Sequence, residues 1–430
     1  MRVQTTLVLA LALALAWGGA PAGSYPLDGY ADTGIIRLEA YRLAAQGTAR
    51  PDFLTEGEML PSMAITLSLK NTPGFSIPDP DPELSARLKE IIGKDAPHYG
   101  VTVLDYTDPD RPRYAAHNGG RQQNPGSVGK IMVLLAWFQA LADIYGDDVE
   151  ARQRLLMDAE ITADAFIRKD SHKVPKWTWG MGSVDRVPIE EGDTASVYTF
   201  LDWMASASSN AAAGMLMKEL ILLKHYGKDY PVPKAEADAW LQSTKKSELG
   251  KIYRDAMIEP LERNGLDMAK LRQGAFFTRE GKNRVPSSTG STATAGELMK
   301  YMVQMEKGEL VDAWSSREIK KLLYLTDQRI RYAASPSLND SAVYFKSGSL
   351  YGCKAEKGYE CGKFLGNRIN YMNSMVIIES HDRDPQIRYA VVVLSNVLRK
   401  NSKDVHQEMG AQIHRIIQRL HPEPPATPTP

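Results

Sequence analysis

Hydrophobic and polar positions along the chain predict strands near both ends and helices between them. Residues 82–93 have the spacing of an amphipathic helix, and residues 99–106 and 113–118 form a predicted strand pair around the turn DPDRP. Later in the chain, we expect strands over residues 342–349, 372–380 and 387–396 and a final helix over residues 405–420. This order predicts one sheet of the α+β class, with a helical subdomain looping out of the middle.

The middle of the chain is predicted to be mostly helical. Residues 149–224 follow a helical pattern apart from the interruption KVPKWTWGMGS, and a charged helical insertion continues to about residue 263. Within the interruption, Trp177 and Trp179 fit a substrate cleft, and they fit packing inside the subdomain equally well.

Residues 23–81 form an N-terminal extension to which the pattern assigns no role. Within it, MAITLSLK (residues 63–70) alternates as a half-buried strand would, and SIPDPDPEL is typical of a stiff linker. Residues 82–420 hold the clearer architecture and are treated as one domain. The last ten residues, HPEPPATPTP (421–430), are rich in proline, and we expect them to be disordered.

The first 22 residues have the features of a secretory signal peptide. Arg2 precedes the apolar run LVLALALALAW, and small residues ending in A-P-A provide a cleavage site. We therefore expect an exported protein, in the bacterial periplasm or outside the cell. No cysteine follows the run, so a lipid anchor is not indicated. No later segment has 18 consecutive apolar residues, so no membrane span is expected after signal removal.

Charge and cysteine content narrow the possible partners. Lysine plus arginine equals aspartate plus glutamate at 52 each, which gives no sign of a nucleic-acid partner. Cys353 and Cys361 are the only cysteines, and in an exported protein so close a pair is expected to form a disulfide. No histidine lies nearby to complete a metal site, and we expect neither a metal nor another cofactor.

The segment PGSVGKIMVLLAWFQ (residues 125–139) carries the first candidate chemistry. From 131 to 138 every residue is apolar, so a helix here must be buried on nearly all sides. Burial lowers the pKa of a lysine, and Lys130 stands at the mouth of this helix. Ser127 lies one turn earlier on the same face, within reach of that amine. A hydroxyl beside a basic amine is the arrangement of an activated nucleophile.

Two other interpretations of this segment remain open. Serine is a favoured helix N-cap and lysine often extends to solvent, and the same S-x-x-K spacing occurs at Ser243 and Lys246 in a charged stretch. NPGSVGKI also approaches a phosphate-binding loop. However, Asn124 replaces the first glycine of that motif, and Ile131 replaces the hydroxyl that would hold Mg²⁺.

Two further short motifs follow the serine. Ser208-Ser209-Asn210 falls at a predicted buried helix junction, and Lys346-Ser347-Gly348 falls in a predicted strand. S-x-N recurs in the loop at 337–339, so one match alone carries little weight. The conjunction carries more, because S-x-x-K, S-x-N and K-[ST]-G occur in this order on ordered elements.

With these motifs, residues 82–420 resemble the penicillin-interacting serine enzymes, the class A β-lactamases and D-alanyl-D-alanine peptidases. The stretch SSTGSTATAGELMKYMVQMEKGELVDAWSSREIKKLL, from Ser287, is similar to the helices that those β-lactamases carry before the lysine-motif strand. The resemblance implies their β-lactamase/transpeptidase fold, an antiparallel sheet of about five strands flanked by helices with a helical subdomain inserted.

The resemblance also implies catalytic roles. Ser127 would attack the carbonyl of a cyclic or peptide amide and become acylated. Lys130 would serve as its base or polarise its hydroxyl. Ser208 would pass a proton to the leaving nitrogen. The backbone N–H groups of Ser127 and Ser349 would form the oxyanion hole.

The remaining motif residues would bind substrate. Asn210 would hold the substrate's side-chain amide, while Lys346 and Ser347 would bind its carboxylate. Gly348 would leave room beside the strand. The alternative for Lys346 is an exposed edge-strand lysine that guards against aggregation.

The sequence departs from the class A pattern at the deacylation step. Those β-lactamases use the glutamate of an E-x-x-L-N loop to activate water, and this motif is absent between Asn210 and Lys346. The nearest candidate is Glu280, with Asn283 following one residue too soon. The alternative is that Glu280 is a solvated loop residue. Without such a base the acyl-enzyme would persist, as in penicillin-binding proteins.

Three functions follow. The favoured one is an exported β-lactamase-like serine hydrolase with a β-lactam as its small-molecule partner. The second is a peptidase, amidase or esterase acting on a peptidoglycan stem peptide, with slow β-lactam release. The third is a cell-wall binding protein without catalysis, in which Ser127→Ala would change nothing.

Overall fold

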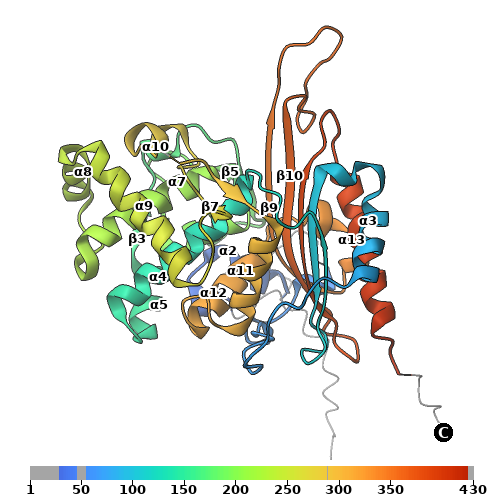
Figure 1. Ribbon diagram of the computed structural model, residues 1–430. Coiled ribbons are helices and arrows are strands. Elements are labelled where there is room, and N and C mark those ends of the chain that lie inside the picture. Colours follow the sequence, from blue (N-terminus) through green and yellow to red (C-terminus); the bar gives the residue numbers. More distant parts are fainter. Residues whose placement is uncertain (1–28, 46–54, 288, 425–430) are drawn as a thin grey trace, which may run out of the picture.

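A computed structural model describes residues 29–45, 55–287 and 289–424, and its largest sheet has five antiparallel strands (Figure 1). Their order is β2-β1-β11-β10-β9. The bounds are β1 Tyr99–Asp105, β2 Arg113–His117, β9 Ala342–Gly352, β10 Ile369–Glu379 and β11 Arg388–Asn396. The predicted sheet and all five predicted strands are confirmed. The sheet joins distant segments, since Tyr99 of β1 faces Ser395 of β11.

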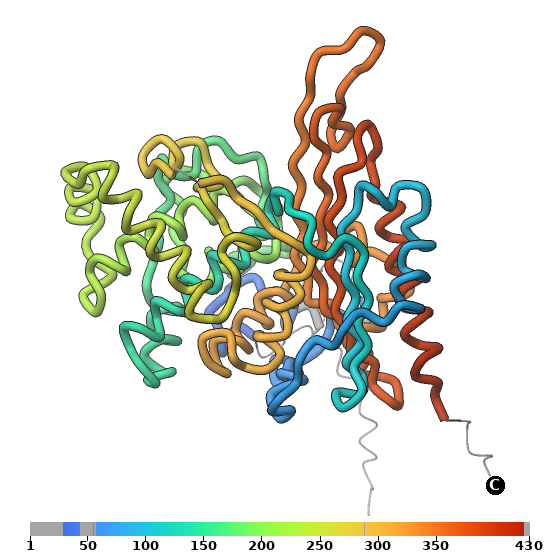
Figure 2. The backbone as a smooth tube through the Cα atoms, viewed as in Figure 1, coloured from blue at the N-terminus to red at the C-terminus, as the bar shows by residue number. Residues whose placement is uncertain are grey.

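Helices cover both faces of this sheet (Figures 1 and 2). α3 (Pro82–Ile92) and α13 (Lys403–Leu420) share one face, where Met409, Ile413 and Ile417 of α13 recur at helical spacing and are buried. α11 (Ala295–Lys307) and α12 (Ala313–Tyr324) pack on the other face. Both helices at the two ends of the predicted domain, over 82–93 and 405–420, are thus confirmed within a residue or two.

A buried helix, α4 (Lys130–Tyr145), packs against α12 and so lies on the same side of the sheet as α11 and α12. It is continuous with the 3₁₀ turn Gly126–Gly129, and its residues 130–141 are all buried. It packs against α7 (Asn210–Tyr226) and α9 (Lys246–Arg263) of the helical subdomain. The span Gly126–Tyr145 is long and apolar enough to cross a membrane, but 78% of its most apolar window is buried inside the protein. It is therefore the core helix that the apolar run predicted.

The remaining helices and strands are shorter or lie in the subdomain. The α-helices are α1 Gly29–Thr33, α2 Ile36–Ala45, α5 Val149–Asp158, α6 Val197–Ala205, α8 Lys234–Ser243 and α10 Arg279–Arg284. Three two-stranded sheets pair β3 (Glu160–Thr162) with β6 (Thr194–Ser196), β4 (Lys173–Lys176) with β5 (Asp185–Pro188), and β7 (Leu271–Arg272) with β8 (Thr292–Ala293).

The prediction of mostly helix over 149–224 is wrong for residues 160–172 and 184–196, which flank the predicted interruption. Residues 160–196 form β3 to β6, the 3₁₀ turn Ala165–Ile167 and the connections between them. From residue 175 on, prolines and glycines at positions 175, 180, 182, 188 and 192 disfavour a helix. The two tryptophans in this segment differ in environment. Trp177 is 2% exposed and packs edge-on against Trp179, which is 59% exposed.

The predicted strand over 63–70 is also wrong. Side chains of α12 bind this segment's backbone in place of a neighbouring strand. Arg317 donates to the carbonyl of Ile65 at 2.9 Å, and Lys320 donates to that of Thr66 at 2.7 Å. Because these bonds satisfy the backbone, no ladder is needed. Ile65 and Leu69 enter the main core, so this part of the extension packs into the body of the protein.

The boundaries at residues 22, 81 and 420 stay predictions. The predicted signal peptide, residues 1–22, lies outside the described residues, as does most of the predicted tail.

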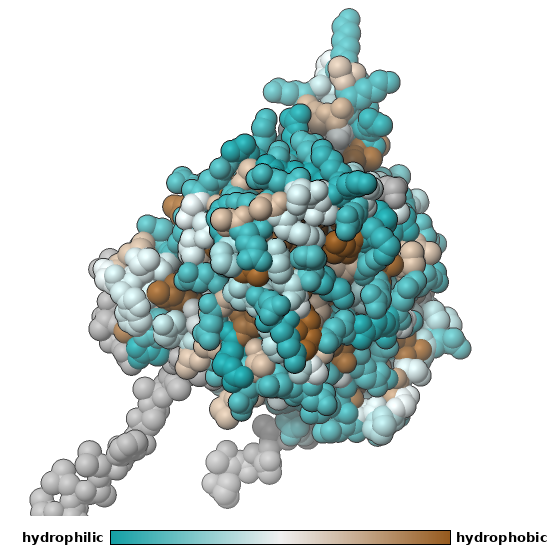
Figure 3. Space-filling model, turned by 90° about the vertical axis from the view of Figure 1, so that its left-hand side faces the viewer, coloured by the Kyte–Doolittle hydropathy of each residue, from teal (hydrophilic) through white to brown (hydrophobic). Residues whose placement is uncertain are grey.

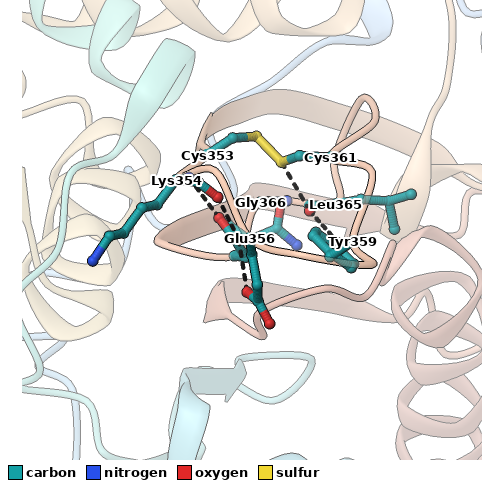
Figure 4. The surroundings of a disulfide bond; sticks show 9 residues. Cys353, Lys354, Glu356, Tyr359, Cys361, Leu365 and Gly366 are labelled. Carbon is teal, nitrogen blue, oxygen red and sulfur yellow. Dashed lines mark hydrogen bonds between the residues drawn. A yellow bond between two sulfur atoms is a disulfide. The ribbon is translucent and has the colours of Figure 1, made fainter.

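An arm formed by the connection between β9 and β10 extends beyond the rest of the molecule (Figures 1 and 3). The predicted disulfide between Cys353 and Cys361 is present there, with 6.1 Å between the two Cα atoms (Figure 4). Next to it, the hydroxyl of Tyr359 donates to the carbonyl of Leu365. At the base of the arm, Leu350 and Tyr351 are 40% and 41% exposed.

Candidate active site

The turn that carries Ser127 lies directly against strand β9. Gly126 has φ +56°, a conformation that L side chains rarely adopt, and a Cβ there would lie 2.9 Å from the backbone nitrogen of Ser349. A Cβ at Gly348 would lie 2.2 Å from the carbonyl oxygen of Pro125 and 2.9 Å from the backbone nitrogen of Ser127. Only glycine fits either position. The backbone nitrogens of Ser127 and Ser349 therefore lie on two segments in direct contact.

Lys130 is fully buried and surrounded by acceptors. Its Nζ lies 2.9 Å from Ser127 Oγ, 2.7 Å from the Ser208 carbonyl oxygen and 2.8 Å from Asn210 Oδ1. Burial, and then the charge of Lys346, lowers its pKa well below the usual value, and only Asp170 opposes this. A neutral amine has two N–H groups and one lone pair. With the carbonyl and the amide oxygen accepting those N–H groups, the lone pair faces the hydroxyl of Ser127.

Ser208 lies between two amines. Its Oγ accepts from Lys346 Nζ at 2.8 Å and lies 3.5 Å from Lys130 Nζ. Its φ is +60°, an uncommon value for a residue with a side chain and one that often marks functional sites. Burial, and then the nearby Arg331, lowers the pKa of Lys346 to about 7. A proton can therefore move along the row Lys130, Ser208 and Lys346.

Asp170 lies outside the S-x-N motif and hydrogen-bonds to Ser209 within it and to Ala211 directly after it. Its carboxylate accepts from Ser209 Oγ at 3.1 Å and from the backbone N–H of Ala211 at 2.8 Å, and His172 Nδ1 contacts it at 2.5 Å. Burial raises the pKa of this carboxyl, but the His172 contact and the Ala211 hydrogen bond outweigh burial and hold it below its usual value. No local motif marks Asp170, and the sequence analysis missed it.

Arg331 is a second residue that the motifs did not reveal. It is 4% exposed, and its guanidinium donates to the carbonyls of Gly348 at 2.7 Å and Asn373 at 3.2 Å. Burial lowers its pKa to about 10. This cation therefore fixes the backbone of β9 beside Lys346 and Ser347.

The structure brings the three motifs together, but it does not bring Glu280 into contact with them. The carboxylate of Glu280 accepts from Arg284 Nε at 2.7 Å on α10. The ring of Phe277 instead faces Lys130, whose Nζ lies 4.6 Å from the ring centroid. Among the described residues, no carboxylate makes a hydrogen bond or ion pair with Ser127 or Lys130. Activation of water by Glu280 stays a prediction.

A cavity of about 380 Å³ opens beside Ser208, Lys346 and Ser347. Within the described ranges, no group of three or more His, Cys, Asp or Glu side chains is placed to hold a metal ion.

A sequence profile of the β-lactamase enzyme family matches residues 83–360, more than half of the chain. The chain belongs to the β-lactamase enzyme family. No curated protein sequence matches this family member significantly.

Solved structures agree on the fold of this β-lactamase family member. The structure of PBP-A superposes with a TM-score of 0.50 at 11% identity, over 80% of this chain and 100% of its own. A β-lactamase from Sphaerobacter thermophilus DSM 20745 gives a TM-score of 0.50 at 16% identity, over the same shares of the two chains. At these identities the likeness shows the fold alone, which is that of the β-lactamase and penicillin-binding serine hydrolases.

Proposed function

We propose that the protein is an exported serine hydrolase that acts on a β-lactam-type amide through a covalent acyl-enzyme at Ser127. The observation that carries this proposal is the environment of Lys130, a buried amine with a lowered pKa at 2.9 Å from the hydroxyl of Ser127. A general base must be in its neutral form and within hydrogen-bond distance of the hydroxyl that it deprotonates. The lowered pKa of Lys130 favours the neutral amine, and its distance from Ser127 Oγ is that of a hydrogen bond.

In the proposed reaction, Lys130 takes the proton of Ser127 while Oγ attacks the amide carbonyl carbon. The oxyanion is stabilised by the backbone N–H groups of Ser127 and Ser349. When the C–N bond breaks, Ser208 gives a proton to the leaving nitrogen and is reprotonated from Lys130 through their 3.5 Å contact. Asn210 holds the acyl side of the substrate, and Lys346 with Ser347 holds its carboxylate.

The fate of the acyl-enzyme separates two candidate functions. Hydrolysis needs a base that activates water, and the described residues offer no carboxylate against Ser127 or Lys130, where Phe277 lies instead. This observation favours the second candidate, a peptidoglycan D-alanyl-D-alanine peptidase or a related amidase or esterase that releases β-lactams slowly. The first candidate, a β-lactamase with rapid turnover, requires Glu280 to leave Arg284 and act on water.

Intact-protein mass spectrometry over time, with a chromogenic β-lactam, tests both candidates. We expect an adduct on the wild type that persists, and none on Ser127→Ala. A transient adduct with accumulating product that Glu280→Gln converts into a persistent one would instead identify a β-lactamase. An equal adduct on Ser127→Ala would exclude Ser127 as the acylated residue. No adduct on either protein would exclude the acyl-enzyme and favour a non-catalytic binding protein.

Export rests on residues 1–22 alone. Expression of the full chain in a bacterial host, followed by N-terminal sequencing of the mature protein, tests it. We expect the mature chain to begin near residue 23 and to be recovered outside the cytoplasm. Full-length protein retained in the cytoplasm would contradict export.

A further inference from the structure

The cavity beside the candidate active site has walls from segments far apart in sequence. Strand β9 contributes Lys346 and Ser347, and the S-x-N junction contributes Ser208. The other walls come from the loop after α12 and from the β4–β5 hairpin of the irregular segment 160–196. They contribute Thr326, Asp327, Gln328 and Ile330, and Lys173 and Arg186.

The charged side chains of this cavity are mostly cations. Three cations, Lys173, Arg186 and Lys346, line it together with one carboxylate, that of Asp327. Arg186 binds Asp327 through two contacts of 3.1 Å, so this pair is neutral overall. Lys346 donates to a hydroxyl and a carbonyl. Lys173 is exposed at the start of β4, and no carboxylate among the described residues pairs with it.

The position of the cavity relative to the reacting atoms decides which part of a substrate can enter it. In the proposed function, on which this inference rests, Ser208 protonates the leaving group and Lys346 with Ser347 binds the substrate carboxylate. All three residues line the cavity, whereas the acyl-side residue Asn210 does not. The cavity is therefore continuous with the leaving-group side of the site.

We propose that this cavity is a leaving-group subsite for a second anionic group, with Lys173 as its specificity-determining residue. The preferred acyl donor then has a leaving group with two acidic groups. One binds at Lys346 and Ser347, and the other extends beneath the β4–β5 hairpin to Lys173. The Arg186–Asp327 pair fixes this hairpin to the loop after α12 and so holds Lys173 at the rim.

Two thioester probes separate the two anionic positions. Both carry a benzoyl-D-alanyl acyl group. The leaving thiol is mercaptoacetate, with one carboxylate, in the first probe and 2-mercaptosuccinate, with two, in the second. In either case Ser127 Oγ bonds to the acyl carbon, the C–S bond breaks, and the thiol departs with the proton that Ser127 gives up. A thiol-reactive chromogen reports the release.

We expect the wild type to show a kcat/KM about two- to fivefold higher for the two-carboxylate probe, the range of one exposed charged contact. Lys173→Glu should abolish or reverse this preference, because it lowers kcat/KM for the two-carboxylate probe much more than for the one-carboxylate probe. Lys173→Gln should abolish it without reversal. The matched control is Lys89→Glu on α3, an exposed lysine on the far side of the sheet with the same charge change, and it should retain the preference.

Two results would overturn the inference alone. One is a wild type that reacts with both probes at the same kcat/KM, and the other is a Lys173→Glu variant that slows both probes equally. A wild type that forms no adduct with either probe or with a β-lactam overturns the proposed function, and this inference with it. A preference that Lys89→Glu also loses would show long-range charge rather than a subsite, and would equally overturn the inference.

Discussion

Lys130 and Lys320 are both fully buried, and their surroundings give them opposite properties. Lys320 of α12 contacts two carboxylates, Glu306 at 2.7 Å and Glu379 at 2.8 Å. Burial alone would lower the pKa of Lys320, but these two charges raise it. Lys130 has a hydroxyl, a carbonyl and an amide oxygen as neighbours, and its pKa is lowered.

The comparison shows that burial by itself does not make a lysine a base. The ammonium of Lys320 is stabilised as a cation by its two carboxylates. It also donates to the carbonyl of Thr66 and so connects the N-terminal extension to α12. A buried amine whose largest charge interaction is with another lysine is held towards the neutral form. The first arrangement contributes to the fold, and the second provides a proton acceptor beside a nucleophile.

Replacing Lys130 tests whether this lysine acts as the base, and it should change the acylation rate more than any other substitution considered below. Lys130→Met removes the base, so we expect the acylation rate to fall by about 10² to 10⁴-fold. The free energy of unfolding should change by less than about 1.5 kcal/mol, because the side-chain volume is kept and no carboxylate loses a partner. Stopped-flow acylation and denaturant unfolding measure the two effects. A loss of stability with unchanged acylation would contradict the comparison.

The same substitution at Lys320 should give the reverse pattern. Lys320→Met leaves Glu306 and Glu379 buried without their cation, and we expect a loss of about 3 to 5 kcal/mol in the free energy of unfolding. The acylation rate of the folded fraction should stay at the wild-type value. The double variant Lys320→Met/Glu306→Gln is the control and should recover part of the loss. A large drop in acylation by folded Lys320→Met would show that the two lysines are not separable.

A third buried lysine, Lys346, should control how the acylation rate depends on pH. Lys346 has a pKa of about 7 and must be charged to bind a carboxylate. Acylation by a carboxylate-bearing β-lactam should therefore fall as pH rises through about 7, and by about tenfold one pH unit above it. As a base, Lys130 acts in the opposite sense, because its lowered pKa and its deprotonation give a limb of the profile that rises with pH. Lys346→Arg keeps the charge and should move the falling limb above about pH 9. A falling limb that stays near 7 in this variant would exclude Lys346 as its source.

The smallest expected effect concerns Asp170, the one acid that raises the pKa of Lys130. Asp170→Asn can still accept from the N–H of Ala211 but loses the negative charge. The pKa of Lys130 should fall further, which moves the rising limb of the pH profile to lower pH. We expect kcat/KM at neutral pH to change by less than about tenfold. A rising limb that stays in place would show that Asp170 only positions the S-x-N motif.

The sequence pattern predicted the parts of the fold that depend on local periodicity. The central sheet, α3, α13 and the burial of α4 all follow from runs of apolar residues whose spacing matches one type of element. The segment MAITLSLK has strand spacing as well, but its backbone binds the side chains of Arg317 and Lys320 instead. Local pattern could not distinguish these partners from a neighbouring strand.

The candidate site was predictable where short motifs mark it and unpredictable elsewhere. Ser127, Ser208 and Lys346 could be found because each stands in a fixed spacing. Asp170 and Phe277 reach the site from connections without regular periodicity, and only their position in space gives them a part in it. Glu280 was predicted to activate water only because it comes nearest to the E-x-x-L-N pattern between Asn210 and Lys346. In the structure its carboxylate binds Arg284.

The pairing of β1 with β11 has a consequence for how the protein is made. Among the described residues, β1 is the first strand and one of its two partners is the last, β11, and the backbone of residues 65–66 is bound by side chains of α12. The first contact can form only after the chain has been synthesised through β11, near residue 396, and the second only after residue 320. Contacts so distant in sequence slow folding and leave apolar strands unpaired meanwhile. A chain shortened before residue 388 would lack β11 and could not close its sheet, so C-terminal truncation should give insoluble protein rather than a smaller active enzyme.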